Sequence, residues 1–322
     1  MEKIRLGVLG AADIAVRKFL PALAKCDDVT FAGVASRGNK DKAQSICDQY
    51  GGKVYGDYDA LLGSDDIDAV YIPLPPALHA QWIIKALEAG KHVLSEKPFT
   101  ISTEDTEKIL GLADENGLTV FENYGFVYHD QIRLMKELLD KGEIGELRQV
   151  EAVFGFPKRD PKDFRNVKAL GGGALLDAGG YVIKAATLFL GKGPRVLSSL
   201  LKESPDHDVD FWGSVLMCDE DKIPAQLSFG MDDSYRCSIR LWGSTGEMYS
   251  DRAFTAPADL AVPVIVKKGG NEEKHLSEAS DQFLLSIERF AEAVRDREAA
   301  KRVSEEIMLQ ARLIQSAMEQ DI

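Results

Sequence analysis

Between Ile4 and Phe121 the sequence alternates short apolar runs with helix-like segments, and this alternation constrains the fold more than any other feature. Apolar runs of strand length lie at 4–9, 29–36, 69–72, 92–95 and 118–121. The stretches between them carry helix start and stop signals, such as Asn39 before one helix and Gly90 after another. Strands that alternate with helices form a parallel sheet with right-handed crossovers and helices on both faces. We therefore expect residues 1–122 to form a doubly wound α/β domain.

The pattern changes after Phe121. A helix predicted at 129–139 is followed by segments with β character and turn residues between them, at 146–154, 195–201, 209–217, 224–229, 237–242, 247–250 and 261–267. Two helices, at 281–295 and 302–319, follow these segments. This order predicts a second α/β domain, residues 123–322, with an open, mainly antiparallel sheet; its last helix is a candidate to pack back on the first domain.

Few helices are available to cover the second sheet, so one of its faces is expected to stay open. An apolar open face is normally covered by a partner subunit. The second domain is therefore expected to bind substrate and to form a homodimer or homotetramer through its sheet.

Composition excludes several classes of function. The net charge of −13 argues against nucleic acid, whose binding needs clustered positive charge. The start is charged and enters a strand directly, and no apolar run is long enough to span a bilayer. The four cysteines lie far apart and form no CxxC pair, so neither a disulfide framework nor a metal site is predicted. These features predict a cytoplasmic protein that does not bind membranes.

The turn after the first apolar run is the candidate cofactor site. It comprises Gly10, Ala11, Ala12, Asp13 and Ile14, and it opens a helix predicted at 13–25 that Pro21 should bend. A dinucleotide fingerprint has G-x-G-x-x-G/A there, so the alanine in the middle position is a departure. The location between a strand and a helix N-terminus still favours phosphate binding. A small-residue turn without a ligand is the alternative.

The end of the second predicted strand indicates which nucleotide binds. An NAD site places an acidic residue there for the ribose 2′-hydroxyl. This strand ends instead in Ser36 and Arg37, which can hydrogen-bond and pair with a 2′-phosphate. NADP(H) is therefore the predicted cofactor, and a solvated Arg37 is the alternative.

Two further segments carry candidate chemistry. Glu96 and Lys97, followed by Pro98, end a strand and so lie at the carboxyl edge of the predicted sheet, where such sheets bind ligands. The segment GGGALLDAGGY at 171–181 predicts a close backbone approach followed by a helix with Asp177 and Tyr181 on one face. A surface lysine and a closely packed structural helix are the respective alternatives.

These motifs together resemble the Gfo/Idh/MocA oxidoreductase family over nearly the whole chain. The resemblance includes the turn at 10–15, PLPPALH at 73–79, the Glu96-Lys97-Pro98 signature and WGSTG at 242–246. The segments at 171–181 and 251–257 look closest to the branch that reduces nucleotide-linked 3-keto-deoxysugars. The family implies an N-terminal Rossmann dinucleotide-binding domain and a C-terminal α/β domain.

The resemblance also implies roles for individual residues. The turn at 10–14 would hold the pyrophosphate, and Ser36 and Arg37 the 2′-phosphate. Leu74 and His79 would line the adenosine and ribose side. Glu96 and Lys97 would lie beside the nicotinamide, with a Lys97–Pro98 bond that is often cis in the family.

In the implied reaction, hydride attacks a ketone carbon and the developing alkoxide takes a proton. The Lys97 ammonium would stabilise the oxyanion and can pass a proton. Many family dehydrogenases carry His where Tyr181 stands, and a phenol with an ordinary pKa of about 10 suits proton donation. Tyr181 therefore favours reduction, and Lys97 and Tyr181 both remain candidate donors. Asp177 is expected to orient a substrate hydroxyl or the lysine.

A basic island precedes the three glycines, comprising Lys158, Arg159, Lys162, Arg165 and Lys168. It suggests an anionic ligand, either a nucleotide-sugar diphosphate or, through Arg165, the cofactor. A solvated loop is the alternative.

The leading hypothesis is therefore NADPH-dependent reduction of a keto group on a nucleotide-linked 3-keto-deoxysugar, that is, a sugar C-3 ketoreductase. The second is an NADP-dependent dehydrogenase of a free aldose or polyol. A third, a non-catalytic nucleotide sensor, is disfavoured by the presence of Lys97, Asp177 and Tyr181.

Overall fold

The computed structural model describes residues 2–322 and separates into two compact units. The first comprises the chain up to Asn123 together with Phe283–Ala311, and the second comprises Tyr124–Gln282 and Arg312–Ile322. Part of the C-terminal helices thus groups with the first unit. The division into domains at residues 122 and 123 remains a prediction.

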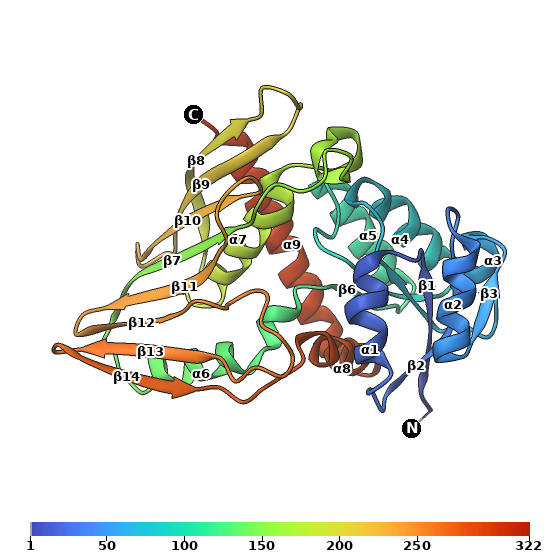
Figure 1. The fold of residues 1–322 in the computed structure, drawn as a ribbon, viewed down its shortest axis with the longest axis horizontal. Coiled ribbons are helices and arrows are strands. Elements are labelled where there is room, and N and C mark those ends of the chain that lie inside the picture. Colours follow the sequence, from blue (N-terminus) through green and yellow to red (C-terminus); the bar gives the residue numbers. More distant parts are fainter. Residues whose placement is uncertain (1) are drawn as a thin grey trace. The chain divides into compact units, whose positions relative to one another are not determined.

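The first unit contains a six-stranded sheet in the order β3-β2-β1-β4-β5-β6, with every pairing parallel (Figure 1). Its strands are β1 (Ile4–Leu9), β2 (Val29–Ala35), β3 (Lys53–Tyr55), β4 (Ala69–Ile72), β5 (His92–Ser95) and β6 (Val120–Glu122). All four residues of β4 are buried, as expected for a strand covered on both faces. The predicted doubly wound fold is confirmed, and its strand order is that of dinucleotide-binding sheets.

Helices connect these strands at α2 (Lys40–Tyr50), α3 (Tyr58–Leu62), α4 (His79–Glu88) and α5 (Thr103–Glu115). Asn39 and Ser102 cap α2 and α5 by accepting backbone N–H groups, as their positions in the sequence predict. The first helix is irregular, because a π-helical turn at Ala15–Phe19 precedes α1 (Leu20–Leu23). Pro21 lacks the N–H that a regular helix would use there.

Two elements of this unit were not predicted. β3 has three residues and lies at the sheet edge, and two of these residues are exposed. It therefore has no continuous apolar run by which the sequence could indicate a strand. α3 is a short helix that begins at Tyr58 after the cap Asp57, whose carboxylate accepts the N–H of Ala60 at 2.7 Å.

The second unit contains an eight-stranded sheet in the order β14-β13-β12-β11-β7-β10-β9-β8 (Figure 1). All its pairings are antiparallel except β7 with β10, which confirms the predicted mainly antiparallel sheet. The strands are β7 (Leu147–Gly155), β8 (Arg195–Glu203), β9 (Asp210–Cys218), β10 (Pro224–Gly230), β11 (Arg236–Gly243), β12 (Gly246–Ser250), β13 (Pro263–Lys268) and β14 (Asn271–Leu276). β14 was not predicted, because it is a polar edge strand.

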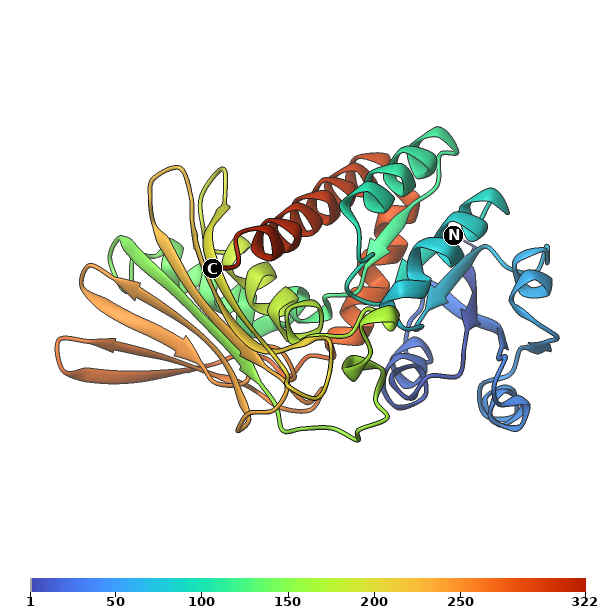
Figure 2. The ribbon, with the colours of Figure 1, turned by 90° about the horizontal axis from the view of Figure 1, so that it is seen from above.

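Helices pack on one face of this sheet. α7 (Gly180–Thr187) contacts β7 and β10, and α6 (Asp130–Asp140) contacts β13 (Figure 2). Burial alternates accordingly along β9, where Phe211, Val215 and Met217 are buried and Trp212 is exposed. The face that bears Trp212 is therefore the open one.

The last two helices are α8 (Gln282–Arg295) and α9 (Arg297–Glu319), and α9 begins earlier than predicted. Within residues 2–322, no helix has the length and apolarity needed to cross a membrane.

Candidate active site

The turn after β1 has the geometry of a phosphate-binding turn. Gly10 has φ +110°, and a Cβ there would lie 3.1 Å from Leu74 Cδ2 and 3.4 Å from the Tyr58 hydroxyl. Its N–H donates to the carbonyl of Ala35 at 2.8 Å, which joins the ends of β1 and β2. Only glycine fits this position without strain.

The rest of the turn is accessible. Ala11 and Ala12 are half-buried, while Asp13 and Ile14 are exposed. Asp13 pairs with Lys42 at 2.7 Å, and the hydrogen bond from Lys42 holds the pKa of this carboxyl below its usual range. Asp13 therefore stays ionised, with its charge compensated by Lys42 from the neighbouring helix.

Ser36 and Arg37 follow β2 at the same edge of the sheet. The Ser36 hydroxyl is buried and accepts the N–H of Asn39 at 3.3 Å. The Arg37 guanidinium lies over two rings, 4.9 Å from the centre of Tyr58 and 4.8 Å from that of Trp82. The structure thus brings the predicted 2′-phosphate residues beside the predicted pyrophosphate turn.

His79 is buried at the start of α4. Its Nδ1 lies 2.8 Å from the carbonyl oxygen of Pro98, and its Nε2 lies 2.8 Å from that of Leu74. Burial lowers the pKa of His79, so the ring is neutral and its single N–H donates to one of the two carbonyls. The ring thereby links the Leu74 loop to the segment after Lys97, and a direct role of His79 at the cofactor stays a prediction.

Glu96 and Lys97 follow β5, and the Lys97–Pro98 bond is cis, as the family resemblance implied. The Glu96 carboxyl accepts the hydroxyl of Tyr71 at 2.6 Å and the amide of Asn123 at 2.7 Å. Burial raises the pKa of Glu96, although both donors oppose that rise. Glu96 is thus tied to β4 and to the residue that follows β6, while Lys97 is half-buried at the sheet edge.

Tyr181, in the second unit, stands inside a group of aromatic rings. Its ring centre lies 5.2 Å from that of Tyr124, 5.7 Å from Phe126, 5.1 Å from Phe154 and 5.7 Å from Phe254. Such contacts fix the plane of a ring through packing and edge-to-face attraction. The direction of the Tyr181 hydroxyl is therefore set by its neighbours.

Arg165 and Asp177 form a partly buried ion pair. Arg165 Nε donates to Asp177 at 2.5 Å, and its terminal nitrogen donates to Asp163 at 3.1 Å. Burial disfavours the charge of Arg165, but Asp177 and Asp163 outweigh it and raise the pKa of the guanidinium. The guanidinium stays charged, so Arg165 orients Asp177 four positions before Tyr181.

The glycines at 171–173 permit the close approach that the sequence predicts. A Cβ on Gly172 would lie 2.4 Å from the carbonyl oxygen of Arg165, and one on Gly173 would lie 2.3 Å from Asp210. Asp210 accepts the N–H of Leu175 at 2.7 Å, where the π-helical segment Leu175–Gly179 begins. The expected helix therefore starts with a widened turn, and α7 continues it.

Three residues that shape these sites were missed by sequence reasoning, namely Tyr58, Trp82 and Asp210. Each acts through a contact with a distant segment, and no local motif marks it.

The remaining cations of the basic island have mixed surroundings. Lys158 lies 3.7 Å from Asp232, and Arg159 lies over the ring of Phe156 at 5.0 Å. Lys162 and Lys168 are exposed. An anionic ligand for this island stays a prediction.

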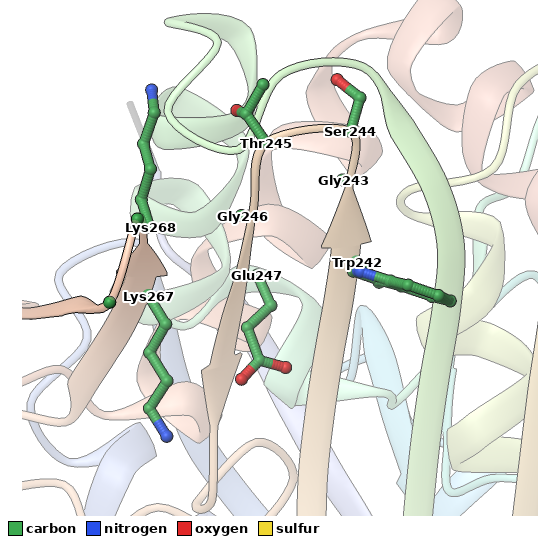
Figure 3. Close-up of a pocket in the computed structure, with 10 residues that line it drawn as sticks. Trp242, Gly243, Ser244, Thr245, Gly246, Glu247, Lys267 and Lys268 are labelled. Carbon is green, nitrogen blue, oxygen red and sulfur yellow. The ribbon is translucent and has the colours of Figure 1, made fainter.

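A surface hollow lies elsewhere, at the hairpin ends of the second sheet (Figure 3). It is lined by residues 242–247 and 267–270 and contains none of the predicted site residues. Within residues 2–322, no cluster of three or more His, Cys, Asp or Glu side chains is suited to hold a metal ion.

Comparison with known proteins places these features in a family. The model described as "Oxidoreductase family, NAD-binding Rossmann fold" matches residues 4–124, and the GFO/IDH/MocA C-terminal domain model matches residues 132–249. A dTDP-3,4-didehydro-2,6-dideoxy-alpha-D-glucose 3-reductase from Actinomadura kijaniata is 42% identical, over 97% of this chain and 93% of that protein. The NADP(+)-dependent D-xylose 1-dehydrogenase 2 of Haloferax volcanii is 31% identical, over 97% of this chain and 96% of that protein.

A solved structure gives the same picture. The 3-ketoreductase from Actinomadura kijaniata, in complex with NADP and TDP-benzene, matches with a TM-score of 0.96 and 41% identity. The match covers 99% of this chain and 98% of that chain.

Proposed function

Because the chain belongs to the Gfo/Idh/MocA oxidoreductase family, we propose that it uses NADPH to reduce the C-3 keto group of a dTDP-linked 3-keto-deoxysugar. This membership confirms the family predicted from the sequence. The observation that carries the proposal is a single sheet edge that unites the phosphate turn, Arg37 and Lys97. The relatives named above support the choice of substrate.

The residues of the first unit bind the cofactor in this proposal. The turn from Gly10 to Ile14 holds the pyrophosphate at the helix N-terminus. Ser36 and Arg37 take the 2′-phosphate, and Leu74 lines the adenosine side. His79 and Glu96 act by holding the segments on either side of Lys97, through the hydrogen bonds to Pro98 and Asn123.

Lys97 and Tyr181 carry the proton chemistry. The cofactor supplies the hydride, which forms the new C–H bond at C-3, and the ketone oxygen gains one proton. The Lys97 ammonium stabilises the negative charge that develops on this oxygen. The Tyr181 hydroxyl donates the proton, and Asp177 orients a sugar hydroxyl.

Two residues of the relative have the same spacing as Lys97 and Tyr181. Solved structures of the Actinomadura kijaniata 3-ketoreductase include variants of a lysine and of a tyrosine. The two are separated in that chain by as many residues as separate Lys97 from Tyr181.

The direct test is NADPH oxidation by the purified protein. With the 3-keto sugar of the named relatives, generated in the assay as its dTDP derivative, we expect NADPH consumption and a 3-hydroxy product identifiable by mass spectrometry and NMR. Absence of turnover with this substrate, together with rapid NADP(+)-dependent oxidation of free xylose or inositol, would overturn the proposal.

That contrary outcome corresponds to the second candidate function, an NADP-dependent dehydrogenase of a free aldose or polyol. The relative from Haloferax volcanii, 31% identical, favours it. The family and the cofactor are common to both candidates, so the same assay separates them.

Substitution of Lys97 tests the catalytic assignment. We expect Lys97→Met to lower kcat by about 10²- to 10³-fold, the usual effect of removing one oxyanion-stabilising group. NADPH affinity, measured by fluorescence titration, should be retained. Lys108, an exposed helix lysine, serves as the matched control, because Lys108→Met should leave both quantities unchanged. Full activity of Lys97→Met would remove the assigned role.

We also propose that the open face of the second sheet joins two copies of this chain. One row of residues crosses β11, β12, β13 and β14, each residue pairing with the next: Trp242, Glu247, Lys267 and Glu272. Their side chains therefore share one face of the sheet. Trp242 is 58% exposed, and Figure 3 shows Trp242, Glu247 and Lys267 on neighbouring strands of this row. An exposed tryptophan among both signs of charge suits contact with an identical surface.

A further inference from the structure

We propose that Tyr58 and Trp82 form an aromatic corner that holds the Arg37 guanidinium in place and thereby determines the preference for NADPH over NADH. The inference rests on the proposed function in taking NADP(H) as the cofactor. It adds two positioning residues, Tyr58 from α3 and Trp82 from α4. In the proposed function they touch neither the pyrophosphate nor the reacting atoms.

The geometry of the aromatic corner is well defined. The Tyr58 and Trp82 rings are perpendicular, with an interplanar angle of 90° and centres 4.8 Å apart. The Arg37 guanidinium carbon lies 4.9 Å from one centre and 4.8 Å from the other. A planar cation in contact with two ring faces loses most of its freedom to rotate, and each contact attracts it.

The aromatic corner is itself rigid. Tyr58 is 5% exposed and Trp82 1% exposed, and both belong to the apolar core that packs α3 and α4 on the sheet. The Tyr58 ring contacts the Arg37 guanidinium, and its hydroxyl faces Gly10, 3.4 Å from where a Cβ on that residue would lie. Tyr58 therefore ties the phosphate turn to the residue that follows β2.

Arg37 has its charge available for a ligand. Among residues 2–322 no carboxylate lies within ion-pair distance of Arg37, whereas the other cation over Trp82, Lys85, is paired with Asp59 at 2.6 Å. The rings hold the guanidinium without using its N–H donors, which point along its edge. An anion that binds at the sheet edge therefore contacts a guanidinium that is already oriented. Binding then costs little additional side-chain entropy.

The same arrangement contains no group that would bind NADH in a comparable way. The position after β2 has no carboxylate for a ribose 2′-hydroxyl. Loss of the aromatic corner should therefore weaken binding of the 2′-phosphate and leave the rest of the nucleotide unaffected.

The experiment compares two fragments that differ only in this phosphate. Binding of 2′,5′-ADP and of 5′-AMP to the full-length protein is measured by calorimetry for the wild type and for Tyr58→Leu, Trp82→Leu, Arg37→Lys and Arg37→Ala. We expect each variant to bind 2′,5′-ADP about 5- to 30-fold more weakly, with 5′-AMP binding unchanged. Arg37→Lys keeps the charge and alters no buried residue, so it remains informative if a core variant fails to fold. Lys85→Met is the control, and it should bind both fragments as the wild type does.

The outcomes separate the two proposals. If the wild type binds both fragments equally, the NADP(H) assignment in the proposed function fails. In a second outcome, the wild type binds 2′,5′-ADP more tightly than 5′-AMP, and Arg37→Ala abolishes this preference. If Tyr58→Leu and Arg37→Lys nevertheless retain the preference, the role of the aromatic corner is overturned and the cofactor assignment stands. Equal weakening of both fragments in the Tyr58 and Trp82 variants also overturns it, because the rings would then serve packing alone.

Discussion

Tyr181 shows how a single hydroxyl is aimed by apolar neighbours. Its ring contacts Tyr124, Phe126, Phe154 and Phe254, and these contacts involve the ring rather than the oxygen. Tyr181→Phe should therefore keep this packing of the ring while removing the hydroxyl.

We expect Tyr181→Phe to lower kcat by about 10²- to 10⁴-fold, the usual contribution of a general acid, with little change in the midpoint of thermal unfolding. Steady-state kinetics with NADPH and differential scanning calorimetry measure the two effects. If kcat were unchanged, Lys97 would be the sole proton donor. A large fall in the unfolding midpoint would instead show that the hydroxyl is structural.

Residue types and order in the chain were enough to predict Lys97, Tyr181, Ser36 and Arg37 as candidates. They follow strands or glycine-rich turns, where local pattern and position coincide. Tyr58 and Trp82 could not be found in this way, because their contact with Arg37 depends on how α3 and α4 pack. In the sequence each reads as an ordinary core aromatic.

At the scale of elements, the start of the helix that carries Asp177 and Tyr181 depends on Asp210. Its carboxyl accepts the N–H of Leu175 at 2.7 Å. Burial raises the pKa of Asp210 to about 6, although the backbone N–H groups of Leu175 and Ala174 oppose that rise. The carboxyl is therefore more easily ionised in the unfolded chain than in the folded protein.

The sign of the pH dependence follows from this shift. Because the pKa of Asp210 is higher in the folded protein than in the unfolded chain, the protonated carboxyl stabilises the fold at pH values below its ordinary pKa near 4. That contribution is lost as the pH rises through about 6. The loss amounts to roughly 3 kcal/mol of unfolding free energy. Asp210→Asn cannot ionise, so its unfolding free energy should rise relative to the wild type by up to this amount between pH 4 and 7.

Urea unfolding of both proteins across this pH range measures the difference. Asp206→Asn, at an exposed turn, is the control and should follow the wild type. Parallel pH profiles for the wild type and Asp210→Asn would contradict the prediction.

The two strands that were not predicted were missed for the same physical reason. β3 and β14 are edge strands that bury little, so their residues need not alternate or be apolar. The helix after the phosphate turn was expected to bend at Pro21, and it accommodates the proline through a π-helical turn. Elements with a buried face were predicted with ends within a few residues.

At the scale of the whole molecule, the alternation of strands and helices predicted the parallel sheet, and the later run of strands predicted the antiparallel one. Both follow from which surfaces must be buried. The open face is the part that burial within one chain does not explain. It combines Trp242 and Trp212, 58% and 45% exposed, with the ion pair of Arg240 and Glu247 at 2.6 Å.

Assembly through this face is the last prediction. A glutamate in place of Trp242 would remove apolar area from the proposed interface and put two like charges near each other in a two-fold arrangement. We expect the wild type to sediment as a dimer or tetramer and Trp242→Glu to dissociate at least tenfold more readily, a change of about 1.4 kcal/mol. Ile101→Glu is the control, because Ile101 is 43% exposed but lies in the first unit. A monomeric wild type, or equal dissociation of both variants, would show that the open face does not join copies of this chain.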